Sequence, residues 1–193
     1  MRRRRLLIHP LSLVVFILVI LIGLCSYPAC GAETNSSWMN LAEYTLNMTD
    51  SLEAKEYLGV ESLKFFSISQ IHAKLIVIGC FSLYCPICHR QAPKANKLFY
   101  IIQQDPDLSK DIKMIGICAG NNSKETGVYK TKFRVQFPLF SDPDFVIHKK
   151  FGSPRTPFTI LVTNNGKVLL FHYGVMKDVE EFVHLVKKFH QQL

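Results

Sequence analysis

The sequence predicts an α/β fold in which helices flank one mixed β-sheet. Two apolar runs rich in β-branched residues, 75–78 and 114–117, have the composition of strands buried on both faces. Helical patterns follow them, at about 86–104 and 123–134. Asn164–Gly166 is a hairpin turn signal between two further apolar runs. Strand, helix, strand, helix and then a hairpin is the order of a mixed sheet covered by helices.

Each expected helix has a residue suited to its start. Pro86 fits a first turn, because a proline there loses no helical hydrogen bond. Asn122 or Ser123 can cap the second helix. Asp178 can cap a final amphipathic helix that runs to about Phe189.

The remaining elements are shorter. A strand is expected at 137–140, and Asp142 and Pro143 then predict a short helix to about Phe151, with the Asp as cap and the Pro in the first turn. The two strands of the hairpin are expected at 159–162 and 168–171.

The N-terminus has the anatomy of a secretory signal. Arg2–Arg5 precede the apolar run Leu11–Cys25, and small residues follow at Ala29–Ala32. The run has 15 residues, whereas a membrane-spanning helix needs about 20. Both a cleaved signal and an uncleaved anchor therefore fit, and lipid attachment at Cys30 or Cys25 is disfavoured by the flanking residues. In each case the domain is exported to a place where disulfides persist.

We accordingly expect three segments. Residues 1–32 are a signal peptide or membrane anchor, and residues 33–59 are a lead-in with a short helix that ends near Gly59. Residues 60–193 form the folded domain.

Charge argues against nucleic acid as a partner. The chain carries a formal charge of +8, but four of its arginines lie at the extreme N-terminus. From Glu33 onward there are 19 Lys and Arg against 15 Asp and Glu, a difference of +4. These basic residues are scattered and form no stripe interleaved with aromatic residues, as a single-strand binder would need.

The candidate for chemistry is the pair Cys85 and Cys88, placed where the first buried strand gives way to a helix. Unpaired N–H groups and the positive end of the dipole at a helix N-terminus stabilise a thiolate. A second cysteine one turn further along can attack the mixed disulfide that the first one forms.

Further features accompany the pair. Pro93 lies five residues beyond Cys88, and Thr156–Pro157 stands just before the hairpin. Other matching segments are Phe66–Ile71, Lys74, Phe137–Pro143 and Gly166–Val168. With these features, the region from Phe66 to Met176 resembles the thioredoxin superfamily, specifically the exported TlpA/ResA-like branch related to redoxins and AhpC/TSA proteins.

The resemblance implies a thioredoxin-like three-layer sandwich and a role for each matching residue. Cys85 would be the exposed attacking cysteine and Cys88 the resolving one. Pro93 would kink the active-site helix, and Thr156 with a cis-Pro157 would lie against the disulfide and position the substrate. Tyr84, Pro86 and Ile87 complete the surroundings of the pair.

Two positions depart from the pattern. Thioredoxins carry a buried Asp six residues before the attacking cysteine, where this chain has Gly79. The residue before the pair is usually Trp and here is Tyr84. The sequence therefore shows no acid to handle the proton of Cys88.

Two more thiols, Cys80 and Cys118, lie near the ends of the two buried strands. A disulfide between directly adjacent parallel strands is geometrically awkward. Free cysteines are commonly buried like small apolar residues, so two separate buried thiols are the favoured interpretation.

Other interpretations of the same residues remain open. Cys85–His89 is also a C-x-x-C-H string, the haem attachment motif of c-type cytochromes. A peroxiredoxin-like thiol peroxidase would share the fold, and Ser82 fits its pattern while Ile78 does not. A non-enzymatic thiol-binding domain is a third possibility. Zinc would need a second ligand pair, and none stands at suitable spacing.

The favoured function is disulfide exchange with protein thiols or disulfides of exported proteins, with no bound cofactor or metal. The membrane is a partner only through the N-terminal segment. By analogy with the branch, substrates could be apocytochrome c or metal-site cysteines. The direction of electron flow cannot be derived from the sequence.

Overall fold

The central sheet has five strands, and its middle strand is buried along its whole length because every residue in it is apolar or small. The computed structural model describes residues 45–47, 51–61 and 65–193, which all belong to one unit, 36–193. The strands are β3 (Leu75–Phe81), β4 (Ile112–Ala119), β5 (Leu139–Asp142), β6 (Phe158–Thr163) and β7 (Val168–Tyr173). Their spatial order is β5-β4-β3-β6-β7. The first three are mutually parallel, and β6 and β7 pair antiparallel, so the predicted mixed sheet is confirmed.

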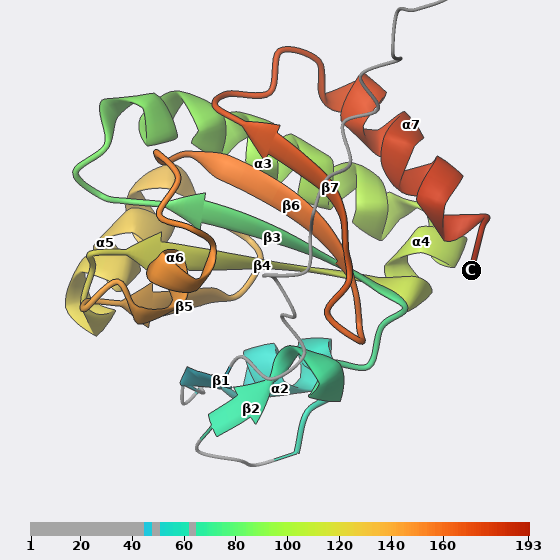
Figure 1. Cartoon of the computed structure of the whole chain (residues 1–193), viewed down its shortest axis with the longest axis horizontal. Coiled ribbons are helices and arrows are strands. Elements are labelled where there is room, and N and C mark those ends of the chain that lie inside the picture. Colours follow the sequence, from blue (N-terminus) through green and yellow to red (C-terminus); the bar gives the residue numbers. More distant parts are fainter. Residues whose placement is uncertain (1–44, 48–50, 62–64) are drawn as a thin grey trace, which may run out of the picture. The chain divides into compact units, whose positions relative to one another are not determined.

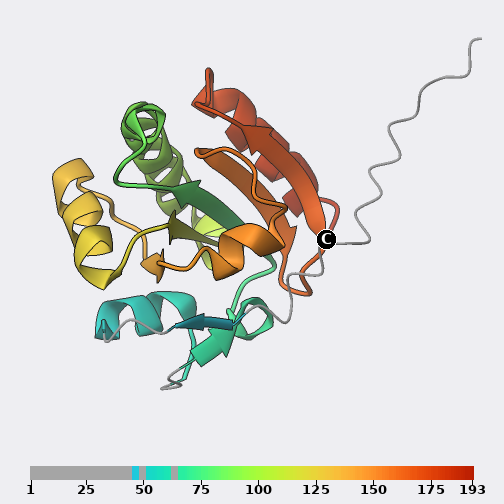
Figure 2. The same ribbon diagram turned by 60° about the vertical axis from the view of Figure 1, so that its left-hand side comes forward.

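Helices cover both faces of the sheet. The α-helices are α2 (Leu52–Leu58), α3 (Pro86–Gln104), α4 (Pro106–Asp111), α5 (Ser123–Phe133), α6 (Val146–Lys150) and α7 (Val179–His190). Figure 1 shows α3 and α7 lying along the sheet, and Figure 2 shows α2 against the opposite face. A small second sheet, β1 (Thr45–Asn47) with β2 (Phe65–Ser67), lies next to the 3-10 turn η2 (Ile68–Gln70).

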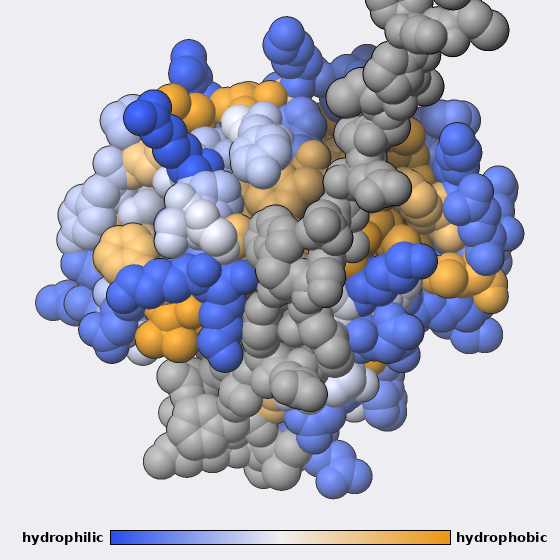
Figure 3. Space-filling view, viewed as in Figure 1, coloured by the Kyte–Doolittle hydropathy of each residue, from blue (hydrophilic) through white to orange (hydrophobic). Residues whose placement is uncertain are grey.

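Alternation along β3 divides the core in two. Val77 and Phe81 pack with α3, α5 and α7, whereas Ile76 and Ile78 pack with α2, α6 and the small sheet. Because side chains alternate along a strand, one buried strand can serve both layers. On the face drawn in Figure 3, the remaining apolar surface is broken up by hydrophilic residues.

Most expected elements are confirmed. The helix expected at 86–104 is α3, with Pro86 in its first turn. Asn122, rather than Ser123, caps α5, and its side chain accepts from the N–H of Glu125. Asp178 caps α7.

The expected positions of β5 and α6 were wrong. The strand runs over Leu139–Asp142 rather than 137–140, because its pairing with β4 starts at Gly116 and Leu139 and continues to Ala119 and Asp142. Asp142 is therefore the last residue of β5 and not the N-cap of a helix.

The chain instead turns through 143–145, and α6 begins at Val146. Phe145, the residue before the helix, has a positive φ of 58°. Asp142 still serves the helix from a distance, because its two carboxylate oxygens accept from the N–H groups of Ile147 and His148 at 3.1 and 2.8 Å.

The lead-in helix ends as expected at Gly59, which adopts the left-handed conformation at φ 65°. The strand β1 in the same segment was not expected. The N-terminal signal or anchor, residues 1–32, lies outside the described residues. Among the residues that are described, no helix is both long and apolar enough to cross a membrane.

Candidate active site

The loop between β3 and α3 presents the cysteine pair, and a buried amide holds it in place. Asn121, fully buried after β4, accepts from the N–H of Leu83 through Oδ1 at 2.8 Å. Its Nδ2 donates to the carbonyl of Gly120. The loops that follow two neighbouring parallel strands are thus tied together, and sequence reasoning had not identified Asn121.

Cys85 is the N-cap of α3, and its half-buried sulfur faces the helix N-terminus. The N–H of Cys88 donates to Cys85 Sγ at 3.2 Å, and this sulfur lies 3.4 Å from the carbonyl oxygen of Thr156. Burial opposes ionisation of Cys85, but hydrogen bonds from the Cys88 and Thr156 side chains and from backbone N–H groups outweigh it. The pKa of Cys85 consequently lies below the ordinary thiol value of 9.0.

Cys88, one turn along the helix, has the opposite environment. Its side chain is 0% exposed. Burial raises the pKa of Cys88 to about 12, and so does the hydrogen bond that its thiol donates to Cys85. The two sulfurs are close but chemically unequal: the outer one ionises readily and the inner one holds its proton.

The Thr156–Pro157 bond is cis, as the resemblance implied. The carbonyl of Pro157 accepts from Gly174 N–H at 2.9 Å, whereas the carbonyl of Thr156 faces Cys85. Among the described residues, the N–H groups of Arg155 and Thr156 have no hydrogen-bond partner. A short stretch of free backbone edge therefore lies beside Cys85.

The position of the missing acid is filled by an aromatic ring. A Cβ added at Gly79 would lie 2.3 Å from Cζ of Phe81, two residues further along the same face of β3. The ring of Phe81 stacks on Tyr129 at 5.7 Å, and the Tyr129 hydroxyl donates to the carbonyl of Cys88 at 3.2 Å. Burial raises the pKa of Tyr129 above its ordinary range. The wall behind Cys88 is thus aromatic where thioredoxins have a carboxylate.

Cys80 and Cys118 lie on opposite faces of the sheet. In the parallel register Cys80 is opposite Ile117 and Cys118 is opposite Phe81. Both thiols are free and 0% exposed. Burial raises the pKa of both, to about 12 for Cys118. Their positions on different faces favour two separate buried thiols over a disulfide.

The neighbouring site residues take different positions. Tyr84, Pro86 and Ile87 are exposed around the pair, and Pro93 interrupts the hydrogen-bond ladder inside α3 because it has no N–H. His89 lies in the first turns of α3. It is half-buried, its Nε2 donates to the Leu83 carbonyl at 2.8 Å, and its ring lies 4.8 Å from that of Phe133.

A groove opens beside Cys85. Its lining includes Tyr84, Phe145, His148 and Arg155, and the last three were not identified from the sequence. Phe145 and His148 belong to the turn before α6 and to α6 itself, which no local pattern brings near Cys85, whereas Arg155 directly precedes Thr156. Within the described residues, no three His, Cys, Asp or Glu side chains gather in a way that could hold a metal ion.

The sequence and the fold of this chain are similar to those of known proteins. The family described as Redoxin matches residues 56–186. The thiol-disulfide oxidoreductase ResA of Halalkalibacterium halodurans is 24% identical over 122 residues, which cover 62% of this chain and 66% of that protein. The match spans just under two thirds of the relative's length.

Solved structures share the fold. A secreted Mycobacterium tuberculosis disulfide oxidoreductase, homologous to E. coli DsbE, superposes with a TM-score of 0.55 at 17% identity. The superposed region covers 76% of this chain and 96% of the Mycobacterium tuberculosis chain. StoA from Bacillus subtilis gives a TM-score of 0.53 at 14% identity, over 67% and 94% of the two chains. The predicted thioredoxin-like fold and ResA-like branch are confirmed, and the predicted enzyme class agrees with the names of these proteins.

Proposed function

This chain belongs to the Redoxin family, and from that premise we propose that it is a thiol–disulfide oxidoreductase whose nucleophile is Cys85. The observation that carries the proposal is the inequality of the two thiols. Cys85 is accessible with a lowered pKa, while Cys88 is buried with a pKa raised to about 12. Attack by the outer sulfur and resolution by the inner one follow from that difference.

In the reducing direction, the Cys85 thiolate attacks one sulfur of a substrate disulfide. A mixed disulfide forms, and the released substrate thiolate takes up a proton. Cys88 then loses its proton and attacks Cys85 Sγ, which releases the second substrate thiol and leaves a Cys85–Cys88 disulfide. Two electrons pass from the dithiol to the substrate, and the same steps in reverse describe oxidation.

Protein substrates suit the site because free backbone lies next to the nucleophile. An extended segment can hydrogen-bond to the edge at Thr156 while its cysteine or disulfide faces Cys85, a form of strand addition. We extend the proposal to exported proteins as substrates, including apocytochrome c or metal-site cysteines, by analogy with the branch.

The same proposal divides the chain as the sequence suggests: a signal or membrane anchor at 1–32, a lead-in at 33–59 and the catalytic domain at 60–193. A secreted relative in the same fold supports export. Fusing residues 1–32 to a reporter that is active only outside the cytoplasm should give activity, and inactivity would contradict export.

Haem attachment fits this geometry poorly. A c-type haem would need both sulfurs, yet Cys88 is fully buried, and the ring of His89 is held by the Leu83 carbonyl. Expression with cytochrome-maturation machinery should give a colourless protein. A Soret band that survives denaturation would indicate covalently bound haem and would contradict the proposal of disulfide exchange.

Trapping tests the mechanism directly. Cys88→Ser should accumulate a slow-migrating, reductant-sensitive adduct on a non-reducing gel, because only Cys88 can resolve the mixed disulfide within the molecule. Cys85→Ser should give no adduct, since the remaining thiol is shielded. If both variants trapped partners equally, or neither did, Cys85 would lose its role as the nucleophile.

A further inference from the structure

The groove beside Cys85 combines aromatic side chains with a single permanent charge. Its volume is about 440 Å³, and it is lined by, among others, Tyr84, Cys85, Phe145, His148, Arg155 and Thr156. Of the described residues that line it, Arg155 is the only Lys, Arg, Asp or Glu. A substrate segment that lies in this groove therefore meets one permanent charge, that of Arg155.

Arg155 is exposed and has no ion-pair partner among the described residues. Its loop is nevertheless fixed. Gly152 and Ser153 adopt positive φ values of 79° and 55° at the end of α6, and His148 Nε2 donates to the Pro154 carbonyl at 2.8 Å. Because the backbone next to Thr156 is already braced, binding of an anion by Arg155 restricts the side chain but costs little backbone freedom.

Phe145 contributes an aromatic ring to the lining of the groove and is held in an unusual backbone conformation. A bulky residue at φ 58° is uncommon, and such residues concentrate at functional sites. The ring sits over Gly120, where an added Cβ would lie 2.4 Å from Cζ of Phe145. It remains 43% exposed, so the fold holds a large apolar side chain at the surface instead of burying it.

Two of the carboxylates near the groove, those of Glu125 and Asp142, are already engaged. Tyr84, 68% exposed, donates its hydroxyl to Glu125, whose other carboxylate oxygen accepts from Asn122 N–H. The oxygens of Asp142 accept two backbone N–H groups. The positive charge of Arg155 is left for a ligand.

From these observations we propose that the groove selects substrates with an acidic residue beside an apolar or aromatic one, close to the reacting cysteine. The inference rests on the proposed oxidoreductase function and names the substrate class of the same site. Arg155 pairs with the acidic residue, and Phe145 and Tyr84 contact the apolar one. Exposed aromatic residues and Arg are the side chains that dominate recognition surfaces.

The test uses three disulfide-linked peptides of equal length that carry Asp, Asn or Lys beside the cysteine and a Phe next to it. Exchange rates with the reduced protein are divided by each variant's own rate with neutral hydroxyethyl disulfide. We expect the Asp peptide to react about 5- to 10-fold faster than the Lys peptide at low salt, with the ratio shrinking at 0.5 M salt (about a 4 Å Debye length).

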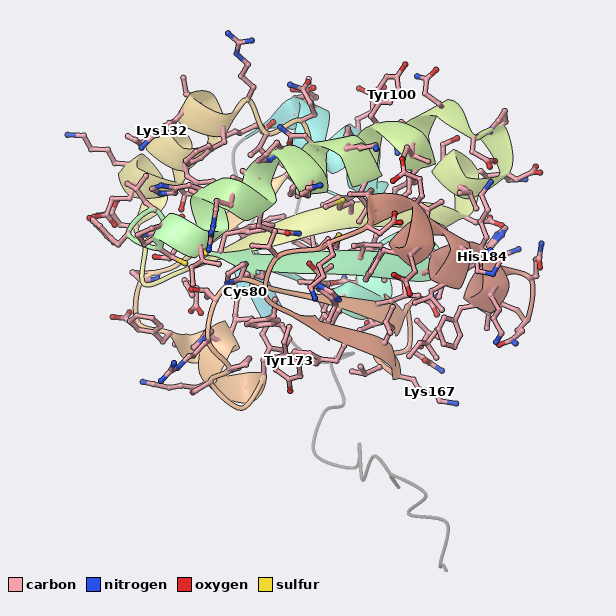
Figure 4. All side chains as sticks on the ribbon, turned by 90° about the horizontal axis from the view of Figure 1, so that it is seen from above. Cys80, Tyr100, Lys132, Lys167, Tyr173 and His184 are labelled. Carbon is pink, nitrogen blue, oxygen red and sulfur yellow. The ribbon has the colours of Figure 1, made fainter. Side chains whose placement is uncertain are left out.

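Arg155→Gln should remove this ratio, Arg155→Glu should invert it, and Arg155→Lys should keep most of it. Lys167→Gln is the matched control, since Lys167 lies at the far end of the sheet from the site, as Figure 4 shows. Phe145→Ala should slow all three peptides alike.

The outcomes separate the two proposals. A wild-type protein that exchanges with hydroxyethyl disulfide but shows no charge preference overturns this inference alone, as does a preference that survives Arg155→Gln. A wild-type protein that exchanges with none of the disulfides overturns the proposed function, and this inference with it.

Discussion

The Cys85–Cys88 pair follows the end of β3, and the Cys80–Cys118 pair lies near the ends of β3 and β4, yet the environments of the two pairs differ. Cys85 stands at a helix N-terminus, half-buried, with N–H groups aimed at its sulfur. Cys80 and Cys118 stand inside strands, fully buried, on opposite faces of the sheet. The side chain is the same, so the difference in predicted reactivity comes from backbone position alone.

Exposure and hydrogen bonding act together in this contrast. Burial raises the pKa of Cys80, Cys88 and Cys118. Only Cys85, the N-cap, has donors that outweigh burial. At the start of α3, one helical turn separates the nucleophilic thiol of Cys85 from the Cys88 thiol, which keeps its proton. Within a strand, a shift of one position moves a thiol from one face of the sheet to the other.

The largest expected effect is loss of the nucleophile. Cys85→Ser should lower the rate of disulfide exchange at least ~1,000-fold, as expected when the reacting atom of a concerted site is removed. Cys80→Ala and Cys118→Ala, the matched controls, should stay within about twofold, because neither thiol reaches solvent. The comparison fails if Cys118→Ala is as damaging as Cys85→Ser in a protein that remains folded.

Alkylation by iodoacetamide should rank the four thiols of the described residues, Cys80, Cys85, Cys88 and Cys118. Because the pKa of Cys85 is lowered, its rate should rise with pH and reach half its maximum below pH 9.0. The other three should react at least ~100-fold more slowly at neutral pH in native protein, since burial protects them unless the fold opens. Mass spectrometry after quenching gives the rates, and half-maximal labelling of Cys85 above pH 9.0 would contradict the assignment.

Introducing the missing acid should be costly. Gly79→Asp places its Cβ against the Phe81 ring and buries a carboxyl group, so we expect a loss of about 3 kcal/mol or more in the free energy of unfolding. Gly127→Asp is the control, because Gly127 is exposed and a Cβ added there would meet no atom within 4 Å. Urea denaturation measures the stability of both variants. Equal midpoints would show that the Phe81 ring moves aside for the new side chain at little cost in free energy.

The smallest effect concerns the hydroxyl behind Cys88. Tyr129→Phe keeps the stack on Phe81 but removes the hydrogen bond to the Cys88 carbonyl, at a cost of about 1 kcal/mol. Tyr100→Phe, on the outer face of α3 and 63% exposed, should cost nothing measurable. Identical urea midpoints for the two variants would mean that the Tyr129 hydroxyl adds nothing to the support of the pair.

The sequence predicts best where local and tertiary preferences agree. Pro86 and the apolar period bound α3 correctly at both ends, and the turn at Asn164–Gly166 locates the hairpin. Around Asp142 they conflict: the local Asp-Pro signal favours a helix start, but pairing with β4 keeps Asp142 in the strand. Strand pairing with β4 overrides the local preference of Asp142 for a helix start. The chain then turns before α6, and Phe145 adopts a positive φ in this turn.

For the site, the residues that follow a chain-local pattern could be found. Cys85 and Cys88 form a short motif, and Thr156–Pro157 matches a family pattern. Asn121 and Phe145 could not be found, because their relevance arises only when separate loops meet at one end of the sheet, whereas Arg155 could have been noticed as the residue before Thr156. Asn121 offers one usable signal, a polar residue two positions after the end of a buried strand.

The contact between Gly79 and Phe81 limits the mutational paths open to this lineage. An acid at position 79 requires either a shift of the Phe81 ring away from Tyr129 or a smaller residue at 81, and the smaller residue alone leaves a cavity against Tyr129. Each single step is unfavourable while the double change relieves the clash, so the two positions should show strong epistasis. Among homologues the two positions are therefore expected to covary.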